Sequence, residues 1–200
     1  MQKGVERMSA VLAVCGEAFC AMVGDGRMVE EPILDGKPKI LTEDLPKVRK
    51  VNKNVVIGFA GDCLAAVQII NALEDYQTQY LTLEKIVKIL TEKGRTVEIQ
   101  PVGVRLLVGG RGRKGDFQLV TLGSAEAFQP QTQPARPGVY LIEGACSHTE
   151  IGPVLEQQVK PQAAQWRSLD DVAKTLDGCI AALAERDESV NAKCFRELIL

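Results

Sequence analysis

Residues 9–27 read SAVLAVCGEAFCAMVGDGR. Two short apolar runs, 10–15 and 18–24, flank the dipeptide Gly16-Glu17, a pattern that predicts a β-hairpin with a two-residue loop. A hydroxyl residue, Ser9, precedes the first predicted strand, and a carboxylate, Asp25, follows the second. Closing the hairpin brings both residues to the same end of the ribbon. This geometry suits an enzyme whose nucleophile lies at or near a chain terminus.

The rest of the chain alternates between predicted strand pairs and helices. Short apolar runs bounded by turn residues predict strands at 47–51, 54–60, 102–108, 117–122, 138–143 and 193–199. Helical spacing and capping residues predict helices after Asp62, from Thr82 to Gly94, over 149–158 and from Ser168. Prolines and an Asp-Gly pair indicate that 28–46 is irregular. Because hairpins join the strand pairs, we expect an α+β fold over residues 1–200. It is a four-layer αββα sandwich, in which two mostly antiparallel sheets are flanked by helices.

Composition limits the classes of function. The chain has 200 residues, of which 46% are hydrophobic and 25% charged, enough for one globular domain with a sizeable core. A net charge of −2 and 4% aromatic residues argue against a nucleic-acid or anionic-membrane partner. No apolar run approaches the roughly 20 residues of a membrane span, and the start does not resemble a signal peptide. Six scattered cysteines without a C-x-x-C pair favour thiols in a reducing cytoplasm.

Two motifs that could carry chemistry are better explained otherwise. Residues 110–115 match G-x-G-x-x-G, but a strand rather than a helix is predicted to follow, so a charged turn is expected instead of a dinucleotide site. His148 is the only histidine, which excludes multi-histidine zinc sites and argues against a Ser-His-Asp triad. No cofactor or metal is expected. An acyl-transfer enzyme without a histidine base can use a free α-amino group, with a pKa near 8, if its hydroxyl residue is N-terminal.

Four segments occur in an order that is hard to meet by chance. Asp25 follows Ser9 by sixteen residues, and then come the segments 47–51 (KVRKV), 58–61 (GFAG) and 186–189 (RDES). With this set the chain resembles the proteasome β-subunit family of N-terminal-nucleophile hydrolases, and within it the bacterial HslV (ClpQ) peptidases. The resemblance covers most of the chain and is strongest over 9–61.

The resemblance implies a catalytic set of six residues: Ser9, Asp25, Lys47, Gly58, Asp187 and Ser189. In that family the terminal hydroxyl attacks an amide carbonyl, with its own α-amine as the base. Lys47 then corresponds to the cation that lowers the pKa of the hydroxyl, and the Gly58 N–H to the oxyanion donor. The two aspartates and Ser189 correspond to residues that orient the site.

The resemblance also implies partners and leaves alternatives open. It implies a peptide or unfolded-protein substrate, a homo-oligomeric ring and an AAA+ ATPase that feeds the ring. Residues 1–8 are a candidate leader, and Met8 stands where self-processing relatives carry Gly; translation from Met8 with loss of the initiator Met is a second route to a free Ser9. The alternatives are a non-catalytic ring-forming subunit that retains its leader and a small-molecule amidohydrolase of the same superfamily.

Overall fold

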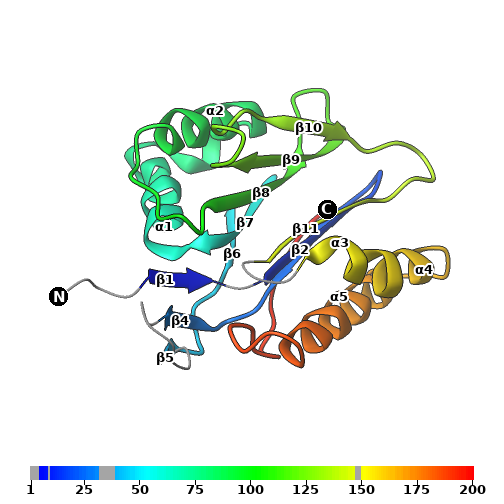
Figure 1. Cartoon of the computed structure of the whole chain (residues 1–200). Coiled ribbons are helices and arrows are strands. Elements are labelled where there is room, and N and C mark those ends of the chain that lie inside the picture. The colour runs from blue at the N-terminus through cyan, green and yellow to red at the C-terminus, as the bar shows by residue number, and fades with distance from the viewer. Residues whose placement is uncertain (1–4, 9, 32–38, 147–149) are drawn as a thin grey trace.

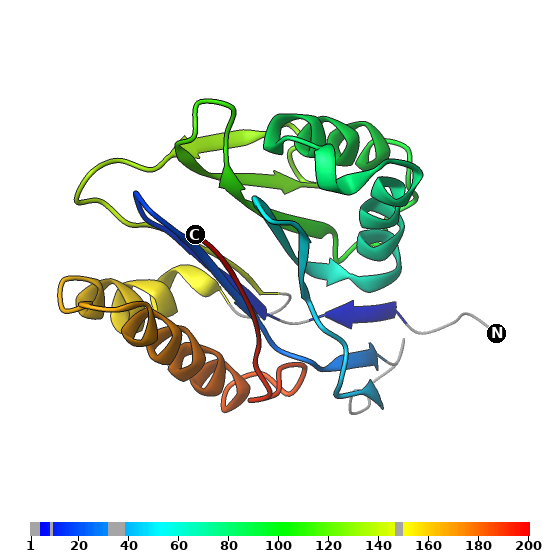
Figure 2. The ribbon, with the colours of Figure 1, turned by 180° about the vertical axis from the view of Figure 1, so that it is seen from behind.

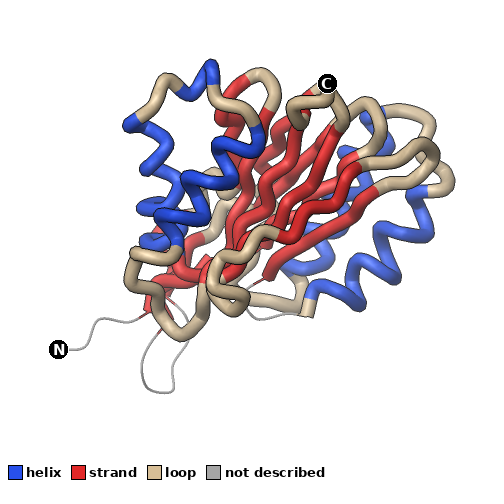
Figure 3. The backbone as a smooth tube through the Cα atoms, turned by 90° about the horizontal axis from the view of Figure 1, so that it is seen from above, coloured by secondary structure: helices blue, strands red, loops and turns tan. Residues whose placement is uncertain are grey.

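The computed structural model describes residues 5–8, 10–31, 39–146 and 150–200, and these form four layers. Two sheets face each other in the middle, and helices cover the outer face of each (Figures 1 and 3). The predicted αββα sandwich is therefore confirmed. Within the described residues, no helix is both long and apolar enough to cross a lipid bilayer.

The larger sheet has the strand order β10-β9-β8-β7-β1-β4-β5, with β6 also paired to β7. Its strands are β1 (Val5–Met8), β4 (Met28–Glu31), β5 (Lys39–Thr42), β6 (Val48–Asn52), β7 (Val55–Asp62), β8 (Val104–Arg111), β9 (Phe117–Gly123) and β10 (Gln131–Pro134). The smaller sheet has the order β11-β2-β3-β12. Its strands are β2 (Ala10–Cys15), β3 (Cys20–Gly24), β11 (Leu141–Cys146) and β12 (Phe195–Ile199). Every pairing between these strands is antiparallel.

The helices divide between the two outer faces. The larger sheet is covered by α1 (Cys63–Asn71) and α2 (Leu83–Gly94), joined by two 3₁₀ turns at Ala72–Asp75 and Thr78–Tyr80. The smaller sheet is covered by α3 (Ile151–Val154), a π turn at Leu155–Val159, α4 (Lys160–Ala163) and α5 (Leu169–Ala184). Figure 2 shows the C-terminal strand β12 along the β2–β3 ribbon, where it pairs with β3 as an edge of the smaller sheet.

Strand β2 lies at the centre of the molecule and is buried on both faces. Val11 and Ala13 face the larger sheet, while Leu12 and Val14 face α5 and its neighbours. This explains why the sequence of β2 is a continuous apolar run rather than an alternating one. Ala10, the first residue after Ser9, therefore begins a fully buried strand.

Helix starts agree with the capping residues in the sequence. Asp62 caps α1, accepting a hydrogen bond from the Ala65 N–H at 3.0 Å. Thr82 caps α2, and Ser168 with Asp171 forms the predicted capping box of α5. These local interactions are specified by residues three apart, so they are readable from sequence.

Elements held by distant pairing differ from expectation. The prediction that 28–46 is irregular is wrong in part, because β4 and β5 form there, and β1 and β10 were not expected. β4 exists because it pairs with β1, which is remote in sequence. The helix predicted over 149–158 extends through α4, residue 149 lies outside the described residues, and the predicted strand 138–143 is shifted to β11. The hairpin turn centres on Glu17-Ala18, closed by the Gly16 N–H donating to the Phe19 carbonyl at 2.9 Å.

Gly58 in β7 provides a test of the packing between the sheets. A Cβ at this position would meet Val11 and Met22, with the Met22 Sδ at 2.5 Å. We expect Gly58→Ala to lower the free energy of unfolding by about 1–3 kcal/mol, because overpacking forces neighbours out of place. Gly178→Ala is the matched control: that glycine is exposed within α5 with nothing within 4 Å of its Cβ position, so stability should rise by about 0.5–1 kcal/mol. Urea unfolding of both variants measures the two changes, and equal signs would contradict the packing described.

Candidate active site

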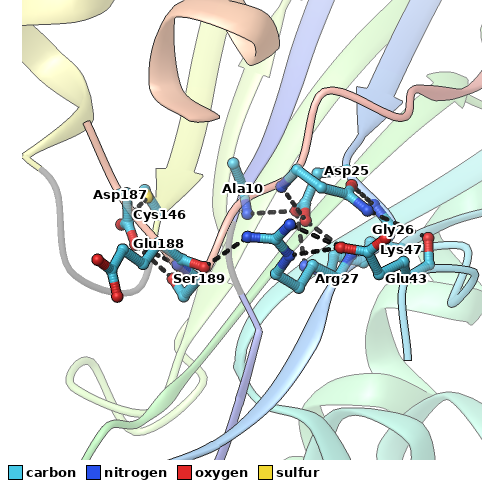
Figure 4. A network of polar contacts seen from close by, with 11 residues as sticks. Ala10, Asp25, Gly26, Arg27, Glu43, Lys47, Cys146, Asp187, Glu188 and Ser189 are labelled. Atoms are coloured by element: carbon cyan, nitrogen blue, oxygen red, sulfur yellow. Dashed lines mark hydrogen bonds and ion pairs between the residues drawn. The ribbon is translucent and has the colours of Figure 1, made fainter. Parts of the chain in front are cut away.

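A buried ion pair lies where the two sheets meet at one end of the sandwich. Asp25 directly follows β3, and Lys47 directly precedes β6. Their side chains are both 0% exposed, and the Lys47 Nζ lies 2.6 Å from the Asp25 Oδ1 (Figure 4). Fully buried lysines are rare unless paired, so this contact fixes the two strand ends against each other.

Backbone N–H groups complete the shell around the Asp25 carboxylate. The Ala10 N–H donates to Oδ1 at 2.9 Å, and the Arg27 N–H donates to Oδ2 at 2.9 Å. A longer bond of 3.4 Å comes from the Asn191 N–H to Oδ2. Both oxygens of the Asp25 carboxylate therefore accept backbone hydrogen bonds. Because Ala10 follows Ser9 in the chain, this carboxylate holds the backbone beside the candidate nucleophile.

Lys47 is under opposing electrostatic influences. Burial lowers the pKa of its ammonium group below the usual value of 10.5, and the charge and hydrogen bond of Asp25 partly offset that effect. The net direction is downward because loss of hydration outweighs the carboxylate. A lysine with a lowered pKa releases its proton more readily than a lysine in water.

Asp187 and Ser189 form a second cluster with Cys146, at the end of β11. The Asp187 Oδ1 accepts hydrogen bonds from the Ser189 N–H at 2.9 Å and the Ser189 hydroxyl at 2.6 Å. Its Oδ2 accepts from the Cys146 Sγ at 3.5 Å. Asp187 and Ser189 are buried. The two residues predicted to support the site are thus in direct contact with each other.

Two residues connect this cluster to the ion pair. Arg27 donates to the Glu188 carbonyl at 2.8 Å and pairs with Glu43 at 2.6 Å (Figure 4). The Asn191 side chain accepts from the Gly26 N–H at 2.9 Å and donates to the Glu43 carbonyl at 3.2 Å. The loop after β3 and the loop before β12 are therefore one hydrogen-bonded unit.

Sequence reasoning missed Asn191 and the role of Cys146. The only signal for Asn191 is its position two residues after Ser189. Cys146 is one of six scattered cysteines, whose spacing carries no signal of a site. Both act through contacts between segments far apart in the chain, so spacing alone does not reveal them.

Ser9 and His148 lie outside the described residues, but the neighbours of Ser9 are placed. Met8 in β1 pairs with Gly61 in β7, and Ala10 in β2 pairs with Cys146 in β11. The two neighbours of position 9 therefore belong to different sheets. Ala10 is also bonded to Asp25 of the ion pair and lies opposite Cys146 of the Asp187 cluster.

Gly58 lies inside β7, paired with Val48 on one side and Leu107 on the other. Its α-carbon faces the smaller sheet in close contact with Val11 and Met22. Its assignment as oxyanion donor stays a prediction. Gly61, three residues later, lies opposite Met8 and has φ +101°, a conformation that favours glycine.

No group of three or more metal-ligating side chains occurs among residues 5–8, 10–31, 39–146 and 150–200. The described part of the site is made of one carboxylate–ammonium pair, a second carboxylate with a hydroxyl, and backbone N–H groups. Such groups can hold charge and move protons at an acyl centre.

Comparison with solved structures supports the fold. No family model matches the chain, and no curated protein matches it in sequence. Eukaryotic HslV from Trypanosoma brucei superposes with a TM-score of 0.60 at 14% identity, covering 96% of this chain and 99% of that one. Anbu (ancestral β-subunit) from Yersinia bercovieri gives 0.67 at 13% identity, covering 95% and 81%. Anbu from Pseudomonas aeruginosa, described as a helical assembly, gives 0.66 at 13% identity, covering 95% and 80%. The chain therefore has the fold of these proteasome-like subunits.

Titration of Lys47 tests the balance within the ion pair. We expect its amine to titrate below the usual 10.5, and to titrate lower still in Asp25→Asn, because that change removes the carboxylate that raises the pKa. The unfolded chain then binds more protons than the folded chain between the lowered pKa and about 10.5, so stability rises with pH across that window. Heteronuclear NMR of the Lys47 side chain measures both midpoints. An unchanged or higher midpoint in Asp25→Asn would refute the assignment.

Proposed function

We propose that the chain is an N-terminal-nucleophile peptidase in which Ser9, once it is the first residue, attacks peptide bonds. The observation that carries this proposal is the bond from the Ala10 N–H to the Asp25 Oδ1, the same oxygen that contacts Lys47. A single carboxylate thus ties the backbone next to Ser9 to a buried ammonium group. Few purely structural needs call for a charged pair at this place.

In the proposed reaction, the Ser9 Oγ bonds to the substrate carbonyl carbon and its proton passes to the Ser9 α-amine. Lys47 stabilises the developing negative charge on the oxygen, and a backbone N–H of Gly58 or Gly61 donates to the oxyanion. The C–N bond then breaks, and the proton moves from the α-amine to the leaving amine. Water cleaves the resulting ester by the same proton route in reverse. Asp187 and Ser189 hold the Cys146 side of the site in place.

The position of β1 supports a peptide as substrate. β1 runs antiparallel between β7 and β4, contributing backbone groups to both neighbours. If the bond between Met8 and Ser9 is cut and the leader leaves, β7 and β4 offer unpaired N–H and C=O groups to an extended peptide. The carbonyl of the residue that replaces Met8 then lies next to position 9.

Partners and location follow from the same proposal. We propose a homo-oligomer, since the structural neighbour from P. aeruginosa is described as a helical assembly, and an AAA+ ATPase that delivers unfolded protein. We also propose the cytoplasm as the compartment, on the pattern of six scattered cysteines without a C-x-x-C pair.

Peptide cleavage by protein that begins at Ser9 tests the proposal. We expect cleavage of fluorogenic peptides by this form, and a loss of at least about 100-fold in kcat for Ser9→Ala, because the attacking oxygen is gone. Lys47→Arg keeps the buried charge but moves it, and should lower kcat by about 10-fold or more while thermal stability stays measurable. Equal kcat values for Ser9→Ala and the parent chain would contradict the proposed mechanism.

One observation favours the alternative of a non-catalytic subunit that retains its leader. β1 is bonded on both edges and is an integral strand of the larger sheet. The intact mass of the protein from its own host separates the two functions. A chain that starts at Ser9 supports the peptidase, and a chain that keeps residues 5–8 supports the scaffold.

A further inference from the structure

A cavity of about 660 Å³ opens beside the candidate active site, where the two sheets diverge. Its walls include Gly61 from the larger sheet and Cys146 from the smaller one. These are the two residues that pair with Met8 and Ala10, on either side of position 9. The cavity therefore adjoins the place where the proposed peptidase cuts its substrate.

Arg105 enters this cavity from the larger sheet. Val104 and Leu106 pack against the helices and Leu107 against the smaller sheet, so alternation along β8 turns Arg105 toward the smaller sheet. Its cross-strand neighbours are Ala60 in β7 and Gly123 in β9. One long cation thus projects from a row whose other two members are small, and the Glu126 carboxylate lies over Gly123 on one side of it, so the open side is that of Ala60.

Ala145 lines the same cavity from the facing sheet. It is also small, so the wall across from Arg105 leaves the space between the sheets open.

Arg105 is exposed, and among the described residues it makes no ion pair and no side-chain hydrogen bond. Other arginines differ: Arg27 pairs with Glu43, and Arg196 pairs with Asp177. Two carboxylates, Glu126 and Glu150, also line the cavity but lie beyond ion-pair distance of Arg105. The guanidinium is therefore available to a carboxylate from outside the chain.

The strand order gives the distance between Arg105 and the bond that is cut. β1 and β8 flank β7, so Met8 and the start of β8 are about 10 Å apart, two strand spacings. A peptide that continues past the Met8 position along β7 places its next residue opposite Ala60, in the same row as Arg105, so the Arg105 side chain faces the side chains of the first residues past the bond that is cut. Because the leader side of that bond is occupied by β1, those residues belong to the segment that is released.

We infer that Arg105 selects substrates with an acidic side chain among the first three residues of the released segment. This inference rests on the proposed peptidase function. The planar guanidinium binds a carboxylate through two parallel N–H···O bonds. A lysine in the substrate cannot accept these bonds, and its positive charge is repelled by the guanidinium. Glu126 and Glu150 line the remaining walls, so the preference is confined to positions that Arg105 reaches.

Charge reversal at Arg105 tests the inference. Protein beginning at Ser9 is assayed with three sets of peptides, which carry Glu, Gln or Lys at the first, second or third position of the released segment. We expect kcat/KM to favour Glu over Lys by about 10-fold at one position at least. Arg105→Gln should abolish that preference, and Arg105→Glu should reverse it. The control is Lys114→Glu, the same change of charge on an exposed residue of the β8–β9 turn, and should leave the ratio unchanged.

The outcomes separate the two proposals. If no peptide is cleaved by the unsubstituted chain, the peptidase proposal fails and this inference fails with it. If peptides are cleaved but the Glu-to-Lys ratio is the same in Arg105→Glu and the parent chain, Arg105 does not read the substrate and the peptidase proposal stands. Thermal unfolding of both Arg105 variants confirms that the comparison is made on folded protein, and Arg105→Gln alone decides the question if Arg105→Glu unfolds.

Discussion

The buried pair between Lys47 and Asp25 is the interaction on which the geometry of this end of the molecule depends. Removing a carboxylate and an ammonium group from water costs several kcal/mol per ion. The attraction across the 2.6 Å contact does not by itself offset this desolvation cost. The additional N–H donors come from Ala10, Arg27 and Asn191, which belong to three separate segments. None of these segments can move away without leaving a buried charge less well solvated. The ion pair therefore locks the start of β2, the loop after β3 and the loop before β12 together.

A purely structural account of this pair is weak. Replacing a buried ion pair by apolar residues of similar volume is often neutral or stabilising, so a fold gains little stability from keeping one. Here the surrounding core is dense and apolar, and an apolar pair at the same place would join the cluster that includes Val11, Met22 and Val48. The pair also lies next to position 9 rather than deep between the sheets. The proposed chemical role of Lys47 accounts for a charged pair at this place.

What could be predicted from the sequence is what local residues determine. The β2–β3 ribbon, the Asp62 cap and the capping box of α5 depend on residues within a few positions of one another. The contact of Asp25 with Lys47 was reached through family resemblance, not through periodicity. β4 was missed because it pairs with β1, and Asn191 because it bonds to Asp25 across 166 positions. Such contacts depend on how the two sheets pack together, which short-range sequence patterns do not predict.

The strand pairing of β1 links the two requirements of the proposed mechanism. While the peptide bond after Met8 is intact, Ser9 has no free amine, and the same four residues fill the position between β7 and β4. A tethered strand acts at a high effective concentration, commonly millimolar, so a free peptide competes poorly for that position. Cleavage after Met8 therefore creates the base and opens the strand edges in one event. In the proposed mechanism an uncut chain therefore lacks both the free amine and the open strand edges.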